Sequence, residues 1–220
     1  MSVALSATGR RHLDDGLDQL DIAVDARQHE RLLALVELLH KWNRAYNLTA
    51  IRSPDEMVAK HLLDSAAVAP YVTEEPLLDV GAGPGLPGLV LAILAPQRSV
   101  TLLDSNGKKV RFQRQAVMEL GLDNVVPVQA RVEAFEPGDA RYPQVISRAF
   151  ASLGDFVRLT NPLVAPGGRW LAMKGPAADD ELAELPDGVA LRDRRTLTVP
   201  FTEADRQLLI VERIDNPGRR

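Results

Sequence analysis

One short segment constrains the fold of this chain more than any other: an apolar run that leads into a glycine-rich loop. It reads Leu-Leu-Asp-Val-Gly-Ala-Gly-Pro-Gly-Leu-Pro-Gly over residues 77–88. Glycine lets the backbone turn sharply and lets a ligand approach where a Cβ would clash. A second apolar run ends in Asp104, whose carboxylate can accept both hydroxyls of a ribose. The segment therefore predicts a strand, a ligand-binding loop and a helix, faced by an acid from the neighbouring strand.

Strand-like and helix-like stretches alternate through most of the remaining chain. The predicted strands are Leu77–Val80, Val100–Asp104, Val125–Gln129, Gln144–Ser147 and Arg169–Met173. The predicted helices are Pro87–Leu94, Gly107–Leu120 and Ser152–Val164, with breaks such as Ala165-Pro166-Gly167-Gly168. This alternation predicts an α/β fold with a doubly wound, mostly parallel seven-stranded sheet of Rossmann-like type. Leu191–Val199 and Gln207–Ile214 both read as strands, which predicts an antiparallel C-terminal hairpin at the sheet edge.

The region before this alternation carries helix signals and no strand signal. Apolar residues recur at three- and four-residue steps over Gln28–Tyr46, the pattern of an amphipathic helix. Ser53 followed by Pro54 predicts the start of a second helix that continues to about Val68. The acidic first 25 residues predict a frayed segment or a short helix. We therefore expect an N-terminal helical cap over residues 1–70 and a main domain over residues 71–220.

Composition excludes several kinds of chemistry. Cysteine is absent, so the chain has no disulfide, thiolate nucleophile or Cys-ligated metal, which fits the cytoplasm. We find neither an export signal nor an apolar run of roughly 18 residues, so no membrane partner is expected. No cluster of acids or histidines accompanies His61, so no metal site is predicted.

Charge is distributed unevenly along the chain. The formal net charge is −4, which argues against non-specific coating of nucleic acid. Residues 104–114, however, hold four basic residues against one acid, and residues 40–61 hold four against two. We predict that these two patches contact RNA, through Lys108, Lys109, Arg111 and Arg114 in the first and Lys41, Arg44, Asn47, Arg52 and His61 in the second. Cations at a helix start oppose the helix dipole, which favours a phosphate partner, although an ordinary solvated face is the alternative.

Two ligands fit the glycine loop. Residues 83–88 satisfy the dinucleotide pattern G-x-G-x-x-G, which would indicate an NAD-linked oxidoreductase. We prefer the frame that begins at Asp79 and continues through Gly81, Gly83 and Gly85, because its glycines directly follow the strand. S-adenosylmethionine carries a sulfonium and an ammonium group, so a nearby acid stabilises it. An oxidoreductase would also need a substrate domain, for which fewer than 50 residues remain beyond Lys174.

Several short motifs give the chain a family resemblance. Between residues 28 and 214 it resembles the glucose-inhibited division protein B family, in the segments Lys41–Thr49, His61–Ser65, Asp79–Gly88, Leu103–Ser105, Arg131–Glu133 and Ser147–Phe150. Members of that family are bacterial N7-guanine methyltransferases of small-subunit ribosomal RNA. The resemblance therefore implies S-adenosylmethionine as cofactor and 16S ribosomal RNA, or the small ribosomal subunit, as partner. No DNA partner is expected.

The resemblance also implies roles for individual residues. Gly81 and Leu86 contact the cofactor from the loop, Val132 and Glu133 meet its adenine end, and Arg148 completes the site. Ser105 joins this predicted site beside the ribose acid Asp104. Taken singly, these residues have plainer interpretations, such as a core valine, a solvated glutamate or a helix-capping aspartate.

Guanine N7 is a lone-pair nucleophile without a proton at neutral pH, so methyl transfer to it needs no general base. Catalysis then depends on holding N7 in line with the S–CH₃ bond. Arg148 is the predicted catalytic residue, a cation at the carboxyl edge of the sheet, with a surface ion pair as the alternative. An arginine that reads this base must take O6 alone or a phosphate, since the usual bidentate contact would block N7. Lys174 is predicted to contact RNA phosphate. A non-catalytic adenosyl-ligand or RNA-binding module remains a further alternative.

Overall fold

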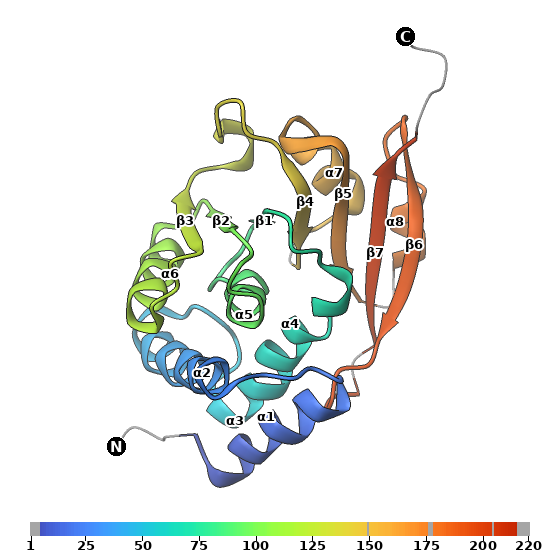
Figure 1. Ribbon diagram of the computed structural model, residues 1–220. Helices are drawn as coiled ribbons and strands as arrows, with labels where there is room; N and C mark the ends of the chain where they lie inside the picture. Colours follow the sequence, from blue (N-terminus) through green and yellow to red (C-terminus); the bar gives the residue numbers. More distant parts are fainter. Residues whose placement is uncertain (1–4, 149, 176–177, 204, 215–220) are drawn as a thin grey trace.

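A seven-stranded sheet runs through the middle of the computed structural model (Figure 1). The structure describes residues 5–148, 150–175, 178–203 and 205–214. The strands are β1 Leu77–Val80, β2 Val100–Asp104, β3 Val125–Gln129, β4 Tyr142–Ser147, β5 Val164–Lys174, β6 Val189–Leu197 and β7 Arg206–Arg213. Their order is β3-β2-β1-β4-β5-β7-β6, parallel from β3 to β5, with β7 antiparallel to both β5 and β6. The predicted fold class is confirmed.

Helices cover both faces of the sheet because the strands are apolar on both sides. In β1, Leu77 packs into one core with the helices α5 (Gly88–Leu94) and α6 (Gly107–Leu120). The next residue, Leu78, faces the opposite core with α7 (Leu153–Thr160). Successive side chains of a strand point to opposite faces, so one buried run serves both layers. The smaller helical elements are η3 Val132–Ala134, η4 Asn161–Leu163 and α8 Ala178–Leu182.

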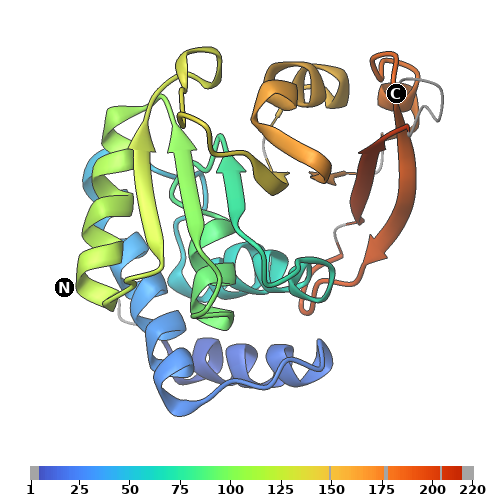
Figure 2. The same cartoon turned by 45° about the horizontal axis from the view of Figure 1, so that its top comes forward.

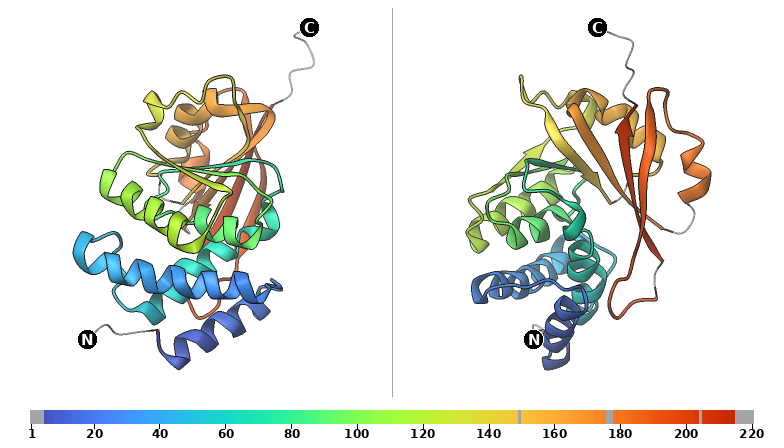
Figure 3. Two further views of the ribbon diagram at one scale, coloured as in Figure 1. Left: turned by 60° about the vertical axis from the view of Figure 1, so that its left-hand side comes forward. Right: turned by 45° about the vertical axis from the view of Figure 1, so that its right-hand side comes forward.

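The N-terminal region is helical as predicted, and it packs below the sheet (Figure 3). Its elements are α1 Ala7–Gln19, α2 Ala26–Tyr46, α3 Pro54–Met57, the π-helical turn η1 Val58–Leu63, α4 Asp64–Ala66 and η2 Ala69–Tyr71. Ser53 caps α3 by accepting from the Glu56 amide, with Pro54 in the first turn, as the sequence predicts. The predicted single helix to about Val68 is instead interrupted by η1. Residues of α2 and η1 share one core with β1 and β2.

Within the acidic first 25 residues, Ala7–Gln19 form a well-packed helix, as the short-helix alternative predicted; this stretch is not frayed. Ser6 caps α1, and Leu13 and Leu17 are buried. A Cβ added at Gly16 would overlap the side chain of Leu63, which shows how closely α1 lies against η1. Acidic residues on the outer face of α1 hid this apolar stripe in the sequence.

Two predicted element boundaries need correction. The Ala165–Gly168 break lies inside β5, because Tyr142 pairs with Val164 and Gln144 with Arg169, so the intervening residues bulge from the ladder. The helix predicted to reach Val164 ends at Thr160, where η4 begins. The predicted C-terminal hairpin is present, but β6 alone forms the edge and β7 is an interior strand. No helix in the described part of the chain is long and apolar enough to cross a membrane.

Candidate active site

The glycine loop after β1 adopts a conformation that its sequence requires. Gly81, Gly83 and Gly85 all have positive φ, between 59° and 84°. At Gly85 a Cβ would also lie 2.5 Å from Leu89 Cδ1, so this position excludes larger residues on two grounds. The amides of Gly81 and Ala82 donate to the Leu103 carbonyl of β2, which ties the loop to the neighbouring strand.

The peptide of Gly83 is held from both sides. Its amide donates to Asp104 Oδ2 at 2.8 Å, and its carbonyl accepts from Gln113 Nε2 at 2.8 Å. Asp104 Oδ1 accepts from the Asn106 amide, and the Asn106 side chain caps α6. The predicted ribose acid therefore also shapes the loop. Gln113 was missed at the sequence level, where the available signal was an amide on the buried stripe of α6.

Asp79 lies beneath the loop with no exposed surface. Its Oδ2 accepts from the Gly88 amide at 2.8 Å, whereas its Oδ1 has no hydrogen-bond partner among the described residues. Burial raises the pKa of Asp79 from 3.8 to about 7; the Gly88 amide and Arg148 oppose this rise. A buried carboxylate with a free oxygen suits a cationic ligand group bound close to the loop.

A cleft opens between the loop and the end of β3. Five residues predicted for cofactor binding line it together: Gly81, Asp104, Ser105, Val132 and Glu133. Its other walls are Val80, Leu103, Ala130, Arg131 and Phe150. Apolar walls at one end and Asp104 with Ser105 at the other match an adenine ring and its ribose, so the residues fit an adenosyl cofactor. Leu86 is buried in the core beside this cleft and does not line it. Ala149, from the predicted Ser147–Phe150 motif, lies outside the described residues.

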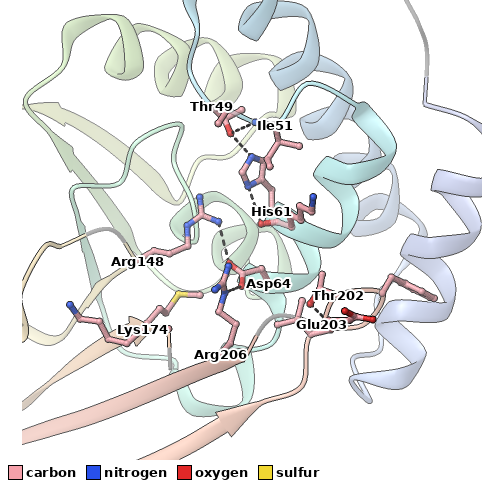
Figure 4. A pocket seen from close by; sticks show the side chains of 15 residues that line it. Thr49, Ile51, His61, Asp64, Arg148, Lys174, Thr202, Glu203 and Arg206 are labelled. Carbon is pink, nitrogen blue, oxygen red and sulfur yellow. Dashed lines mark hydrogen bonds and ion pairs between the residues drawn. The ribbon is translucent and has the colours of Figure 1, made fainter. Parts of the chain in front are cut away.

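A second and larger cavity of about 660 Å³ lies between the N-terminal helices, the end of β5 and the segment that leads into β7 (Figure 4). Arg148 lines it at the end of β4. Asp64 is buried and joins two arginines from distant parts of the chain: Arg148 Nη1 is 3.3 Å from Oδ2 and Arg206 Nε is 2.9 Å from Oδ1. The ion pair considered for Arg148 is thus present, inside a cavity. Arg206 carried no signal in the sequence.

Two predicted RNA-binding residues line the same cavity but already have partners within the protein. His61 is buried, with Nε2 2.8 Å from Thr49 Oγ1 and Nδ1 3.0 Å from the Lys60 carbonyl. Burial, together with the charge of Arg148, lowers the pKa of His61 from 6.5 to about 4, so the ring is neutral at pH 7. Lys174 Nζ is 2.6 Å from Glu181 Oε2. A direct phosphate contact by either residue stays a prediction.

The remaining predicted RNA-binding residues form two surface patches, one on α6 and the other at the end of α2 and in the segment that follows it. The α6 patch consists of Lys108, Lys109, Arg111 and Arg114, and the α2 patch of Lys41, Arg44, Asn47 and Arg52. All are exposed except Lys109, which is half-buried; a Cβ on Gly83 would lie 3.9 Å from its Nζ. The ring of Trp42 packs edge-on against Phe112 and stacks on Tyr46, which brings α2 against α6. Figure 2 shows the two helices side by side.

Within the described residues, no group of three or more His, Asp or Glu side chains is placed to hold a metal ion. Many of the predicted site residues instead line one of two hollows, the cleft beside Asp104 or the cavity beside Asp64. Lys174, which lines the cavity, donates to the carbonyl of Phe150, which lines the cleft, at 3.0 Å. The two hollows are therefore neighbours.

The fold resembles those of solved methyltransferases. The glycopeptide N-methyltransferase MtfA, solved with S-adenosyl-L-methionine, superposes with a TM-score of 0.57 at 15% identity, covering 71% of this chain and 88% of that one. Sheet order, glycine loop and the acid at the end of β2 define the class: this is a Rossmann-like, S-adenosylmethionine-dependent methyltransferase.

The sequence comparisons identify the family within that class. A family model described as rRNA small subunit methyltransferase G matches residues 28–210, and the chain belongs to this family. A ribosomal RNA small subunit methyltransferase G from Chromohalobacter salexigens is 65% identical over 201 residues, 91% of this chain and 96% of its own length. Its counterpart from Pseudomonas syringae pv. syringae is 48% identical over 213 residues, 97% and 99% of the two chains. These comparisons support neither the oxidoreductase nor the non-catalytic alternative.

Proposed function

We propose that the protein transfers the methyl group of S-adenosylmethionine to N7 of a guanine in 16S ribosomal RNA of the small subunit. The relatives are named for methylation of small-subunit ribosomal RNA. The observation that carries the proposal is a direct contact between the two hollows: Lys174, which lines the large cavity, donates to the carbonyl of Phe150, which lines the cleft, at 3.0 Å. A methyl donor in the cleft and a base in the cavity would meet there.

Methyl transfer to N7 needs no general acid or general base. Bound cofactor supplies an electrophilic methyl group on a sulfonium centre. Methyl transfer to N7 would remove no proton, because N7 carries only a lone pair at neutral pH. The protein would therefore have to orient both partners and exclude water. Asp104 and Ser105 orient the ribose end, and Arg148 lies where the two partners meet.

RNA is the expected partner of the α2 and α6 patches, and we propose no contact with DNA or membranes. Lys108, Arg111 and Arg114 on α6, with Lys41 and Arg44 on α2, offer exposed cations to phosphate groups. An enzyme that modifies small ribosomal subunits works where those subunits are, and we therefore propose a cytoplasmic location.

The decisive experiment is transfer of a labelled methyl group to small subunits and to naked 16S RNA that both lack the modification. We expect one labelled guanine, with the label at N7 when the base is mapped. Thermal unfolding with S-adenosylhomocysteine or NADH provides a second test, in which only the former should raise the Tm. Stabilisation by S-adenosylhomocysteine without any transfer to either RNA would instead establish a non-catalytic module.

A further inference from the structure

The large cavity places two guanidinium groups around one buried carboxylate. Four cations and two carboxylates line it, namely Lys60, Arg148, Lys174, Arg206, Asp64 and Glu203. Lys60 and Lys174 are each paired with a glutamate, at 2.7 Å and 2.6 Å. Two guanidinium groups then share the buried carboxylate of Asp64, whereas the remaining lining carboxylate, Glu203, is exposed. The ring of His61 is neutral and adds no charge. This arrangement suits a ligand that brings an anionic oxygen.

Arg206 has N–H groups that are not engaged by the described residues. Its Nε is committed to Asp64 Oδ1, while its two terminal nitrogens make no other hydrogen bond to a described residue. Its side chain is 38% exposed, compared with 22% for Arg148. Arg206 therefore stands nearer the mouth of the cavity and Arg148 nearer the cofactor cleft. Figure 4 shows both arginines reaching Asp64 from opposite sides.

An aromatic ring lies at the rim of the same cavity. Phe201 is 46% exposed and has a φ of +61°, a left-handed conformation that is rare for a bulky residue. The ring of His12 stacks on it with centroids 4.3 Å apart, so α1 helps to hold the phenyl group in place. Strain retained at an exposed aromatic residue is typical of a ligand-binding position. Aromatic faces stack on unpaired bases in RNA complexes.

The geometry points to this cavity as the pocket for the target nucleotide: Arg206 binds its phosphate and Phe201 stacks on a base at the rim. Asp64 holds Arg206 in the orientation that presents its terminal nitrogens. A phosphate contact at the rim leaves N7 of the base free, as transfer to that atom requires. The assignment rests on the proposed RNA methyltransferase function and adds the residues that seat the RNA.

The test compares three variants in methyl transfer to unmodified small subunits, with S-adenosylhomocysteine affinity measured in parallel by calorimetry. Arg206→Gln should lower kcat/KM for the subunit by about tenfold or more, mostly through KM, and leave cofactor affinity within about twofold. Phe201→Leu keeps an apolar side chain without touching Asp64, and it should lower kcat/KM about tenfold through loss of stacking. Arg158→Gln is the matched control, because Arg158 also pairs with an aspartate but lies on α7, outside the cavity.

The outcomes separate the pocket from the proposed function. Unchanged kcat/KM in both Arg206→Gln and Phe201→Leu would overturn the pocket while wild-type activity upheld the function. An equal loss of cofactor affinity and activity in Arg206→Gln would also overturn it, because Arg206 would then act through Arg148 on the cofactor. Absence of methyl transfer by the wild-type protein, with intact cofactor binding, would overturn the function itself.

Discussion

Asp79 and His61 are buried ionisable side chains whose pKa values move in opposite directions. Burial raises the pKa of Asp79 to about 7 and lowers that of His61 to about 4. As the pH falls from 7 to 4, the folded state binds a proton at Asp79 before the unfolded chain does, which stabilises the fold. Over most of that range the unfolded chain protonates His61 first, which destabilises the fold. The two effects oppose each other in the wild-type protein.

Replacing Asp79 by Asn should remove the contribution of Asp79 to the pH dependence of stability and leave that of His61. At pH 8 the wild-type fold carries a buried charge that costs up to about 4 kcal/mol, given a pKa displaced by about three from 3.8. Asp79→Asn should therefore gain stability over the wild type at pH 8 and lose that advantage by pH 4. Urea unfolding at the two pH values measures the difference. The exposed Asp123→Asn serves as control, and a pH-independent difference for Asp79→Asn would contradict the assignment.

Asp104 offers a sharper test of the cofactor cleft. Its carboxylate holds the Gly83 amide and faces the space proposed for the ribose. Asp104→Ala should weaken S-adenosylhomocysteine binding by about tenfold or more, since a charge-assisted hydrogen bond contributes about 1.5–3 kcal/mol. Calorimetric titration checks this, with the exposed Asp123→Ala as matched control. Equal affinity in Asp104→Ala and wild type would remove Asp104 from the ribose site.

At the scale of elements, α1 behaves as part of the core. Leu13 is fully buried against the π-helical turn η1, and the same helix supports Phe201 through His12. The helix therefore links the acidic N-terminal segment to the rim of the cavity. The chain also uses η1 to place His61 on the cavity side while Leu62 and Leu63 face the core.

Leu13→Ala should lower the free energy of unfolding by about 2–5 kcal/mol, because it leaves a void where the surroundings relax only in part. Urea denaturation measures the loss, and Asp15→Ala on the exposed face of α1 should change stability little. If both substitutions changed the free energy of unfolding equally little, α1 would be frayed in solution and the prediction would be wrong.

At the scale of the whole molecule, a net charge of −4 is compatible with RNA binding because seven basic residues gather on α6 and on or just after α2, two helices that pack against each other. This arrangement predicts that the affinity for RNA falls with rising salt concentration, and that a few basic residues account for most of the fall.

Lys108→Gln combined with Arg111→Gln should weaken binding to small subunits and reduce the slope of log affinity against log salt by about 0.7–0.9 for each phosphate that the protein no longer neutralises. Binding titrations from low to moderate salt provide the slope. Arg158→Gln with Arg192→Gln removes the same charge from exposed positions elsewhere and should leave it unchanged. Parallel slopes for wild type and the α6 double variant would exclude this patch from the RNA interface.

The sequence by itself determined the features that depend on neighbouring residues. The bounds of β1, β2, β3 and α6 match the predicted ranges, which rest on short-range periodicity and on glycines that take positive φ. Three residues that line the proposed cofactor cleft, Gly81, Asp104 and Ser105, belong to these elements or directly follow them, whereas Val132 and Glu133 were expected from the family resemblance. Such features are decided within a few residues, so a local pattern is enough to predict them.

Only the tertiary structure decided which distant residues meet. Asp64 and Arg206 are 142 positions apart, and Gly83 and Gln113 are 30 apart. Their contacts depend on the placement of β7 between β5 and β6 and on the packing of α6 below the loop. No local periodicity encodes the order of strands in a sheet, because that order follows from burying all the apolar faces at once. The cavity around Asp64 is a product of that packing.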